Sequence, residues 1–322
     1  MFHGSVMKII RLNSHSVFSA EPRNVTIGAF DGFHLGHQDL IHKVNSLAAL
    51  HGGLRTLISF EPLPHEVFKL ATLHQQDIPR IMPFRDKVLF LMETNLIDEL
   101  IIIPFRNGFL KQSADAFIQN LLIARLGAKS IVVGDDFRFG FKALGDYQLL
   151  QQYADQGDFL LFKMPSRRHE QIRISSTLVR NALVNSDLAA VQRFLGREFT
   201  LSGKVIYGRQ LARTLGFPTL NIALKHAMLP IRGVFNVRSR ACQTGTVYNG
   251  IANIGLRPTV DGVRPMLEIH LFTPSQDFYG QYFEVSFLSK IRDEIKFSGI
   301  DTLKTQIALD VQASRAYFST EL

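Results

Sequence analysis

Apolar and polar positions follow two different rhythms along this chain of 322 residues. In the first half, short runs rich in Val, Ile, Leu and Phe are separated by longer stretches with helical spacing of apolar residues. The runs that we interpret as strands are Val25–Ala29, Leu54–Phe60, Glu99–Ile103, Ser130–Gly134 and Phe159–Met164. The helices predicted between them are His37–Leu50, Phe84–Thr94, Ala114–Leu126 and Tyr147–Ala154.

This alternation predicts a doubly wound α/β domain, in which helices cover both faces of a parallel sheet. Ligands of such sheets bind beyond the carboxyl ends of the strands. The segments to examine for chemistry are therefore those that follow Ala29, Phe60, Gly134 and Met164.

From about Thr200 the apolar runs shorten and alternate with polar residues, as in half-buried strands. Turns that contain glycine separate these runs, and the pattern predicts an antiparallel sheet closed into a small β-barrel. An amphipathic helix from about Thr302 to Phe318 ends the chain. The fold class is thus α/β plus β, with domains at residues 1–185 and 186–322 and a helical connector at Asp187–Leu195.

Composition narrows the class of protein. The chain is 46% hydrophobic and 20% charged, which fits sizeable cores. No apolar stretch approaches the roughly 18 residues of a membrane span, and the first residues lack the apolar run of a secretory signal. The single cysteine, Cys242, excludes an internal disulfide framework and a multi-cysteine zinc site. We therefore expect a cytoplasmic protein.

The net charge of +8 is spread over the chain. Residues 1–198 carry 22 Lys and Arg against 19 Asp and Glu, and residues 199–322 carry 14 against 9. A nucleic-acid-binding protein usually gathers its basic residues on one face or segment. The mild surplus of positive charge fits anionic small molecules such as nucleotides at least as well as it fits nucleic acid.

The first candidate site follows the strand that ends at Ala29. His34 and His37 lie three residues apart at a predicted helix start, so one helical turn places both on one face. Gly32 permits a tight turn, and Gly36 allows a ligand to approach the backbone. A helix N-terminus with two imidazoles can stabilise charge on a transferring phosphate. The alternative is that the histidines only cap a helix or bind a metal.

A second candidate lies at another predicted helix start. Ser175, Ser176 and Thr177 supply three hydroxyls, and Arg180 adds a charge one turn later. This arrangement suits the β- and γ-phosphates of a nucleotide. A helix cap alone would account for one hydroxyl but not for three with a basic residue after them.

These motifs carry a resemblance to a known family. Gly28-Ala29-Phe30-Asp31-Gly32 with His34-Leu35-Gly36-His37 is similar to the H-x-G-H nucleotidyltransferases, and more specifically to bacterial bifunctional riboflavin kinase/FMN adenylyltransferases (FAD synthetases). Three further stretches resemble that family at the expected strand ends: Phe60–Glu66, Val133–Gly140 and Arg173–Arg180. The resemblance begins at Met7, and residues 1–6 look like an extension that we expect to be disordered.

In the first half, the resemblance assigns two sets of residues besides the histidines. ATP and its phosphates would contact Gly28, Phe30, Asp31, Gly36, Ser175, Ser176, Thr177 and Arg180. The flavin and nucleotide would contact Glu61, Pro62, Asp136, Phe137 and Arg138. Without the family, Phe60–Glu66 would be interpreted as a proline-rich loop. One departure is Lys142-Ala143, where the family usually has a glycine and an arginine, and lysine lacks the bidentate fork of arginine.

In the second half, Gly208–Ile222 resembles the riboflavin kinase signature. Thr219 and Asn221 would face the same side of a strand, and both carry oxygens that Mg²⁺ accepts. Leu220 replaces the usual alanine and would face the other side, and Ala212 stands where the family usually has glycine. The resemblance also assigns ATP or phosphate contacts to Gly203, Lys204, Gly208, Arg213 and Gly216.

The resemblance makes Glu268 the general base for the kinase reaction and places Arg292 and Glu294 near the flavin. By themselves, these would be a solvated glutamate on a strand and a surface charge cluster. The implied function is ATP-dependent phosphorylation of riboflavin to FMN in the C-terminal domain, then adenylylation of FMN to FAD with release of pyrophosphate in the N-terminal domain. Mg²⁺ is the implied metal for both steps, and no nucleic-acid or membrane partner is expected.

Three alternatives stay open. An H-x-G-H transferase could act on another phosphorylated compound, although the kinase signatures argue against it. The chain could be a flavin-binding sensor in which the changes at Ala212 or Lys142-Ala143 have silenced an activity. It could bind RNA, but its 26 phenylalanines fall mostly in core-like runs rather than in a basic patch with exposed aromatic residues.

Overall fold

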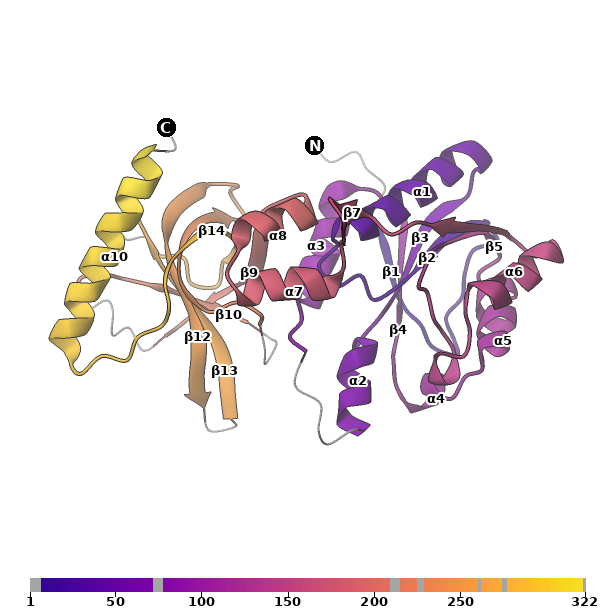
Figure 1. The fold of residues 1–322 in the computed structure, drawn as a ribbon, viewed down its shortest axis with the longest axis horizontal. Coiled ribbons are helices and arrows are strands. Elements are labelled where there is room, and N and C mark those ends of the chain that lie inside the picture. The colour runs from indigo at the N-terminus through magenta and orange to yellow at the C-terminus, as the bar shows by residue number, and fades with distance from the viewer. Residues whose placement is uncertain are drawn as a thin grey trace. The chain divides into compact units, whose positions relative to one another are not determined.

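The computed structural model describes residues 7–71, 78–208, 215–224, 229–259, 262–273 and 277–320. The chain divides into two compact units (Figure 1). Unit 1 comprises residues up to Ile78 and Lys87–Ser175, and unit 2 comprises Pro79–Asp86 and Ser176 onward. Packing therefore joins residues 79–86 and 176–185 to the second unit, whereas the sequence pattern grouped them with the first. The domain boundary after residue 185 stays a prediction.

Unit 1 is built on a six-stranded sheet in the order β1-β4-β3-β2-β5-β6, in which every neighbouring pair is parallel (Figure 1). Its strands are β1 (Lys8–Arg11), β2 (Arg23–Ile27), β3 (Leu54–Phe60), β4 (Glu99–Ile103), β5 (Ala128–Gly134) and β6 (Leu160–Met164). Five of the six are the strands that the apolar runs predict. A short hairpin follows them, β7 (Arg168–His169) and β8 (Ile172–Arg173).

Helices pack on the sheet of unit 1 as the doubly wound interpretation requires. One face is covered by a cluster in which Val25, Ile58 and Ile131 of the strands pack with Phe117 and Leu122. Helix α1 contacts β2, β3 and β5. The helical segments are α1 (Leu35–His51), α2 (Pro64–Ala71), α3 (Phe84–Thr94), α4 (Asn107–Leu110), α5 (Ala114–Ala116) continued by a π-helical turn (Phe117–Ile123), a 3₁₀ turn (Phe141–Ala143) and α6 (Tyr147–Asp155).

The order of the strands fixes where a ligand of unit 1 binds. From β2 the chain moves to β3 on one side, whereas β5 pairs with β2 on the other side. This reversal is the topological switch point, where open α/β sheets bind ligands outside the carboxyl ends of the strands. The segments after β2 and β5 carry the His34–His37 turn and Asp136–Arg138, so two of the predicted motifs follow adjacent strands.

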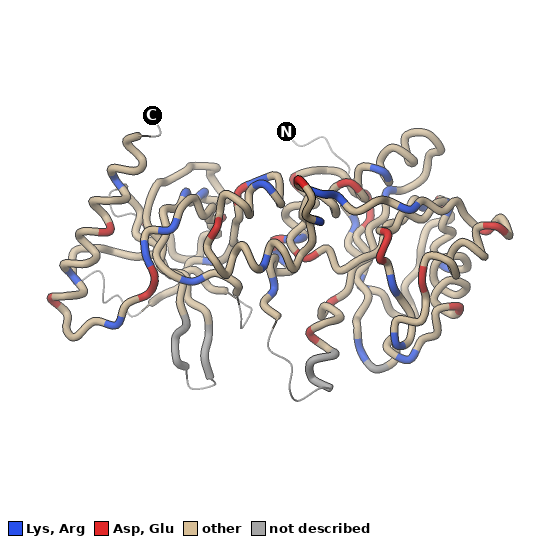
Figure 2. The backbone as a smooth tube through the Cα atoms, viewed as in Figure 1, with Lys and Arg blue, Asp and Glu red and all other residues tan. Residues whose placement is uncertain are grey.

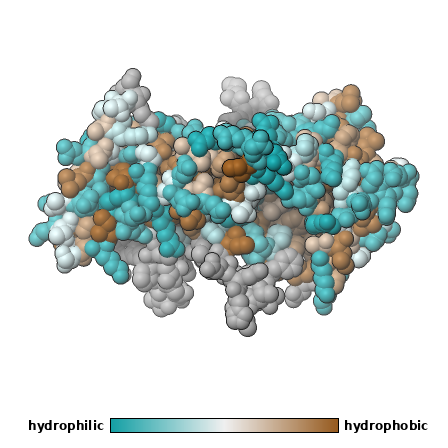
Figure 3. Space-filling view, in the orientation of Figure 1, coloured by the Kyte–Doolittle hydropathy of each residue, from teal (hydrophilic) through white to brown (hydrophobic). Residues whose placement is uncertain are grey.

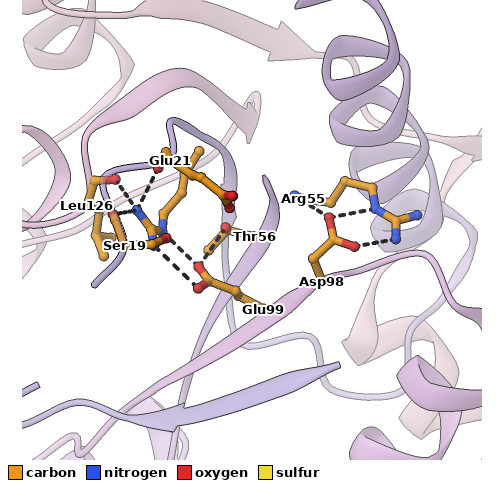
Figure 4. A network of polar contacts seen from close by, with 8 residues as sticks. Ser19, Glu21, Arg55, Thr56, Asp98, Glu99 and Leu126 are labelled. Atoms are coloured by element: carbon orange, nitrogen blue, oxygen red, sulfur yellow. Dashed lines mark hydrogen bonds and ion pairs between the residues drawn. The ribbon is translucent and has the colours of Figure 1, made fainter. Parts of the chain in front are cut away.

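The opposite, amino ends of the strands hold a buried ion-pair network (Figure 4). Arg23 Nε donates to Glu99 Oε2 at 2.7 Å, and Arg23 Nη1 donates to the carbonyl oxygen of Leu126 at 2.9 Å. Both charged side chains are at most 4% exposed. The adjacent Asp98 pairs with Arg55, which keeps the pKa of the Asp98 carboxyl below its usual value despite partial burial. These pairs tie β2, β3 and β4 together away from the ligand end.

Unit 2 contains a closed antiparallel barrel in the order β10-β13-β12-β11-β14-β9. Its elements are α7 (Ser176–Val184), α8 (Leu188–Leu195), β9 (Phe199–Ile206), β10 (Leu220–Ala223), β11 (Gly233–Ala241), β12 (Val247–Thr259), β13 (Gly262–Leu271), β14 (Tyr282–Arg292) and α10 (Ile300–Thr320). The predicted connector is α8, capped by Asp187 and ended by Gly196 with a φ of 71°. The barrel and the terminal helix are confirmed.

The surface mixes charges of both signs. Lys and Arg alternate with Asp and Glu along both units, without one dominant basic run in the part of the chain that is described (Figure 2). Hydrophilic residues cover much of the visible face of each unit, and apolar ones form small separate patches (Figure 3). Within the described ranges, no helix is long and apolar enough to cross a bilayer.

Candidate active sites

In unit 2, strands of the barrel and α10 line an open cavity of about 260 Å³. Polar and charged residues from several strands and from α10 line it together with apolar side chains. The polar lining residues are Thr219, Asn221, Asn253, Glu268, His270, Arg292, Glu294 and Asp310. The five residues that the sequence nominated for metal, base and flavin roles in the kinase therefore line one cavity.

The barrel register explains why these side chains converge. Glu268 on β13 lies opposite Asn221 on β10 and, on its other side, opposite Asn253 on β12. Directly opposed residues of antiparallel strands place their side chains on the same face of the sheet. The result is a row of two amides with a carboxylate between them, all of which reach the cavity. Asn253 begins a stretch, 253–259, that resembles the kinase domain of the family, but the sequence alone did not nominate it for the site, because its pairing with Glu268 appears only in the register.

Asn221 presents a buried amide oxygen at the cavity. Its side chain is 4% exposed, and its Oδ1 atom has no hydrogen-bond partner among the residues that the structure describes. Buried amide oxygens are seldom left unpaired in proteins, so this atom is suited to a ligand. Gly208 lies directly against the Asn221 amide, where a Cβ atom would collide with it. Leu220 is not among the lining residues, as the strand alternation predicts.

Arg292 is held in place by a residue that the sequence analysis missed. Its Nη2 donates to Asp310 Oδ2 at 2.7 Å, and its Nε lies 3.0 Å from each carboxylate oxygen. The side chain of Asp310 is 4% exposed, and Gln306 Nε2 also donates to it at 2.9 Å. The available signal was an acidic residue on the face of α10 that also carries Leu303 and Ile307, both of which line the cavity.

His270 and Glu294 complete the rim of the cavity. His270 Nδ1 lies 3.0 Å from the carbonyl oxygen of Pro218, and burial lowers the pKa of the imidazole. Glu294 lies against Gly255, where a side chain would displace the carboxylate. The cavity is therefore lined by one acidic and one basic side chain from the same segment, Glu294 and Arg292.

The other residues nominated for phosphate contacts in unit 2 have mixed outcomes. Gly203 lies where β9 crosses β10, and a Cβ atom there would come 2.6 Å from the carbonyl oxygen of Ala223. That glycine is therefore explained by packing. Gly216 has a φ of 91°, which favours glycine. Lys204 is exposed on β9. Arg213 and Ala212 lie outside the described residues.

The turn after β2 in unit 1 brings the two histidines together. The rings of His34 and His37 stack with centroids 3.7 Å apart and an interplanar angle of 19°. His34 is the N-cap of α1, and its Nδ1 accepts a hydrogen bond from the backbone N–H of His37 at 3.3 Å. His34 therefore caps α1 through its Nδ1 atom, which is one part of the helix-capping alternative. The expected common face is confirmed.

The turn is shaped by a backbone that side chains rarely adopt. Phe30, Gly32 and Phe33 have φ values of 48°, 90° and 45°. Two of these residues are not glycine, so their left-handed conformation is strained. Both phenylalanine rings are fully buried, and Phe33 stacks on Phe90 with centroids 4.8 Å apart. Packing of the rings thus holds the turn in a shape that presents the helix N-terminus.

The flavin and nucleotide residues predicted after β3 and β5 surround the same end of the sheet. Glu61 and Pro62 directly follow β3, and Pro64 begins α2, so the predicted loop continues into a helix. Asp136 forms an ion pair with Arg173 at 2.5 Å, and Arg138 pairs with Asp146 at 3.0 Å. The exposed Arg173 was quoted as part of a motif but not nominated for the site.

The hydroxyl motif is divided between the two units. Ser175 belongs to unit 1, whereas Ser176, Thr177 and Arg180 lie on α7 in unit 2. The helix begins at Ser176, which confirms the predicted helix start. Arg180 Nε donates to the carbonyl oxygen of Pro79 at 2.9 Å. That these residues meet the phosphates held by His34 and His37 stays a prediction.

Fold and sites define a class of protein: a nucleotidyltransferase-like parallel sheet with an H-x-G-H turn at its switch point, joined to a barrel with a polar, kinase-type cavity. Two family models match the chain, FAD synthetase over residues 18–178 and riboflavin kinase over residues 195–318. The chain therefore belongs to the family of bifunctional riboflavin kinase/FMN adenylyltransferases.

Individual relatives agree. The chain is 40% identical over 296 residues to the bifunctional riboflavin kinase/FMN adenylyltransferase of Haemophilus influenzae, covering 92% of this chain and 94% of the relative. It is 37% identical over 313 residues to the Escherichia coli K12 protein of the same name, covering 97% and 98%. A solved structure from Streptococcus pneumoniae, described as a macrolide-efflux protein, has a TM-score of 0.80 and 27% identity, covering 96% of this chain and 99% of that one.

Proposed function

We propose that this chain makes FAD from riboflavin in two ATP-dependent steps, with riboflavin phosphorylation in unit 2 and adenylylation of FMN at the His34–His37 turn of unit 1. The observation that carries the proposal is that Thr219, Asn221, Glu268, Arg292 and Glu294 all line one cavity. Family membership over nearly the whole chain supports both activities.

In the kinase step, Glu268 is the general base. It accepts the proton of the ribityl 5′-hydroxyl while that oxygen forms a bond to the γ-phosphorus of ATP. The bond from the γ-phosphorus to the β,γ-bridging oxygen breaks, and ADP leaves. Arg292, fixed by Asp310, and Glu294 bind the flavin at the rim of the cavity.

The residues at the cavity fit a magnesium ion. The hydroxyl of Thr219 and the Oδ1 of Asn221, which has no hydrogen-bond partner within the described ranges, are hard oxygen donors, and phosphates and water would complete the coordination. Bound there, Mg²⁺ would neutralise charge on the phosphates of ATP. In the described parts of the chain, no three His, Cys, Asp or Glu side chains are grouped closely enough to hold a metal.

In the adenylyl transfer step, an oxygen of the FMN phosphate forms a bond to the α-phosphorus of a second ATP. The bond from that phosphorus to the α,β-bridging oxygen breaks, and pyrophosphate leaves. His34, His37 and the N-terminus of α1 stabilise the charge that develops at the α-phosphate. We assign the pyrophosphate to Ser175, Ser176, Thr177 and Arg180, and the place of action to the cytoplasm.

A chromatographic flavin assay with riboflavin, ATP and Mg²⁺ tests these roles. Glu268→Gln should lower FMN formation at least ~100-fold, the usual scale for a lost general base, and still convert supplied FMN to FAD. The double variant His34→Ala/His37→Ala should accumulate FMN and lose FAD formation ~100-fold or more. Each variant is the control for the other. The proposal fails if the wild-type chain forms neither flavin, or if either variant loses both activities equally.

A further inference from the structure

The ligand end of unit 1 contains a fully buried lysine that neither the mechanism nor the motifs account for. Lys87 on α3 is 1% exposed. Its Nζ donates to the carbonyl oxygen of Ala29 at 2.7 Å and to Ser59 Oγ at 2.8 Å. Ser59 Oγ in turn lies 3.2 Å from the same carbonyl oxygen. The ammonium therefore meets the chain where β2 and β3 end.

A buried ammonium is costly compared with an apolar side chain of similar length, because it loses its hydration. Packing alone would be served as well by methionine or leucine at this position. One of the groups that the ammonium of Lys87 binds is the carbonyl oxygen of Ala29. Ala29 is the residue from which the strained turn begins, since Phe30, Gly32 and Phe33 follow it with positive φ values. That turn ends at His34, the N-cap of α1.

We propose that Lys87 is a positioning residue for adenylyl transfer. Its ammonium holds the carbonyl group of Ala29 in place by a hydrogen bond. It thereby positions the first residue of the turn that leads to His34 and His37. A charge-assisted hydrogen bond to a carbonyl is stronger than a neutral one. It can therefore help to hold the strained backbone of the turn in its observed conformation. Lys87 acts through the backbone of the turn rather than on the substrate. The inference rests on the proposed role of the histidines.

The test uses the whole chain, because its riboflavin kinase activity serves as an internal reference for its FAD-forming activity. Lys87→Met removes the charge and keeps the length of the side chain. We expect kcat for conversion of supplied FMN to FAD to fall ~100-fold, because misplaced catalytic groups reduce turnover more than binding. KM for ATP and FMN should stay within threefold, and the riboflavin kinase activity of the same sample within twofold. The imidazole NMR signals of His34 and His37 should shift.

Lys129→Met is a matched control. Lys129 Nζ also donates to a backbone carbonyl at 2.7 Å, that of His51, but at the amino end of β5, away from the ligand end. This variant should leave both activities within twofold of wild type. Ser59→Ala, which keeps the ammonium and its bond to Ala29, should lower the FAD-forming kcat about threefold to tenfold.

The outcomes separate the two proposals. If the wild-type chain makes no FAD, or the histidine variant retains FAD formation, the proposed function of unit 1 fails. If wild type is active and Lys87→Met changes KM but not kcat, or changes neither, the positioning role is wrong. Should Lys87→Met abolish both activities by unfolding the chain, Ser59→Ala decides: an unchanged kcat overturns the inference, and a reduced kcat with unchanged kinase activity supports it.

Discussion

At the scale of single residues, the kinase cavity depends on side chains that never need to touch the phosphates. Arg292 reaches the cavity, but its direction is set by the buried carboxylate of Asp310, which accepts hydrogen bonds from two of its nitrogens. An arginine with an incomplete partner set would lose its fixed orientation and leave a buried charge poorly compensated. The flavin-binding role proposed for Arg292 therefore depends on a residue from the last helix of the chain.

Asp310→Asn tests this dependence. The amide keeps one acceptor oxygen but loses the charge, so we expect KM for riboflavin to rise about tenfold and the free energy of unfolding of unit 2 to fall by ~1.5–3 kcal/mol. Conversion of supplied FMN to FAD should stay within twofold. Asp301→Asn, an exposed change in the first turn of the same helix, is the control. An unchanged KM in a chain of reduced stability would show that Asp310 serves only the fold.

At the scale of elements, the turn at Phe141–Ala143 carries backbone strain that the sequence departure explains. Lys142 and Ala143 have φ values of 53° and 57°, where glycine would be unstrained. The family resemblance had marked this pair as a place where a glycine is usual. This chain therefore forms a left-handed turn here with two residues that are not glycine.

Ala143→Gly should stabilise unit 1 by ~0.5–1 kcal/mol, because relief of the left-handed strain exceeds the entropy that glycine loses on folding. Thermal unfolding followed by circular dichroism measures the change. Ala49→Gly, at an exposed position within α1, should instead destabilise by about 1 kcal/mol. If both changes destabilise the chain, the positive φ at residue 143 is not costly.

The first turn of α3 contains a buried acid that makes unit 2 sensitive to pH. Burial raises the pKa of Asp86 to about 6, although both the hydroxyl and the backbone N–H of Ser202 donate to its carboxylate. Nearby Arg85 lowers this pKa, and Glu284 raises it. A carboxyl that binds its proton more tightly in the folded state stabilises the fold at low pH. That stability is lost as the pH rises from about 3.8 through about 6.

The comparison of wild type with Asp86→Asn isolates this effect. The unfolding free energy of the variant minus that of wild type should grow by about 2–3 kcal/mol between pH 4 and pH 8, following the rise of the pKa from 3.8 to about 6. Urea titrations followed by tyrosine fluorescence suit unit 2, since the chain has no tryptophan and most of its 7 tyrosines lie after residue 200. A difference that is independent of pH would mean that Asp86 titrates normally.

The elements that the sequence predicts well are those with a strong internal pattern. The bounds of β3, β4 and α3 agree with the apolar runs, because each buries a continuous or periodic set of side chains. Strand β1, which the sequence pattern missed, lacks such a set, since its residues are mostly exposed at the edge of the sheet. Its place is set by pairing with the distant strand β4.

The site residues also fall into those that a local motif predicts and those that depend on contacts between distant segments. Motif residues such as Glu268 and Arg292 were found from the resemblance, whereas Asp310 was not, because its role arises from the packing of α10. Lys87 gave no signal either, since a lysine in an amphipathic helix ordinarily faces solvent. Contacts between segments far apart in the sequence supply what local patterns lack.

At the scale of the whole molecule, the residues nominated for the two candidate sites are distributed differently between the two units. Every lining residue of the kinase cavity belongs to unit 2. The residues nominated for adenylyl transfer come from both units, since the division falls between Ser175 and Ser176. Among the described residues, the kinase cavity is thus lined by unit 2 alone, and we expect FMN formation to require no residue of unit 1.

If unit 2 forms FMN without residues of unit 1, two defective chains should complement each other in a mixture. His34→Ala/His37→Ala should make and release FMN, and Glu268→Gln should adenylylate it. With Glu268→Gln in tenfold excess, FAD should appear after a lag at the rate at which the histidine variant makes FMN. If the mixture makes FAD at less than a tenth of that rate while it converts added FMN normally, FMN stays on the chain that made it. The unit 2 cavity would then retain its product until the same chain's unit 1 takes it.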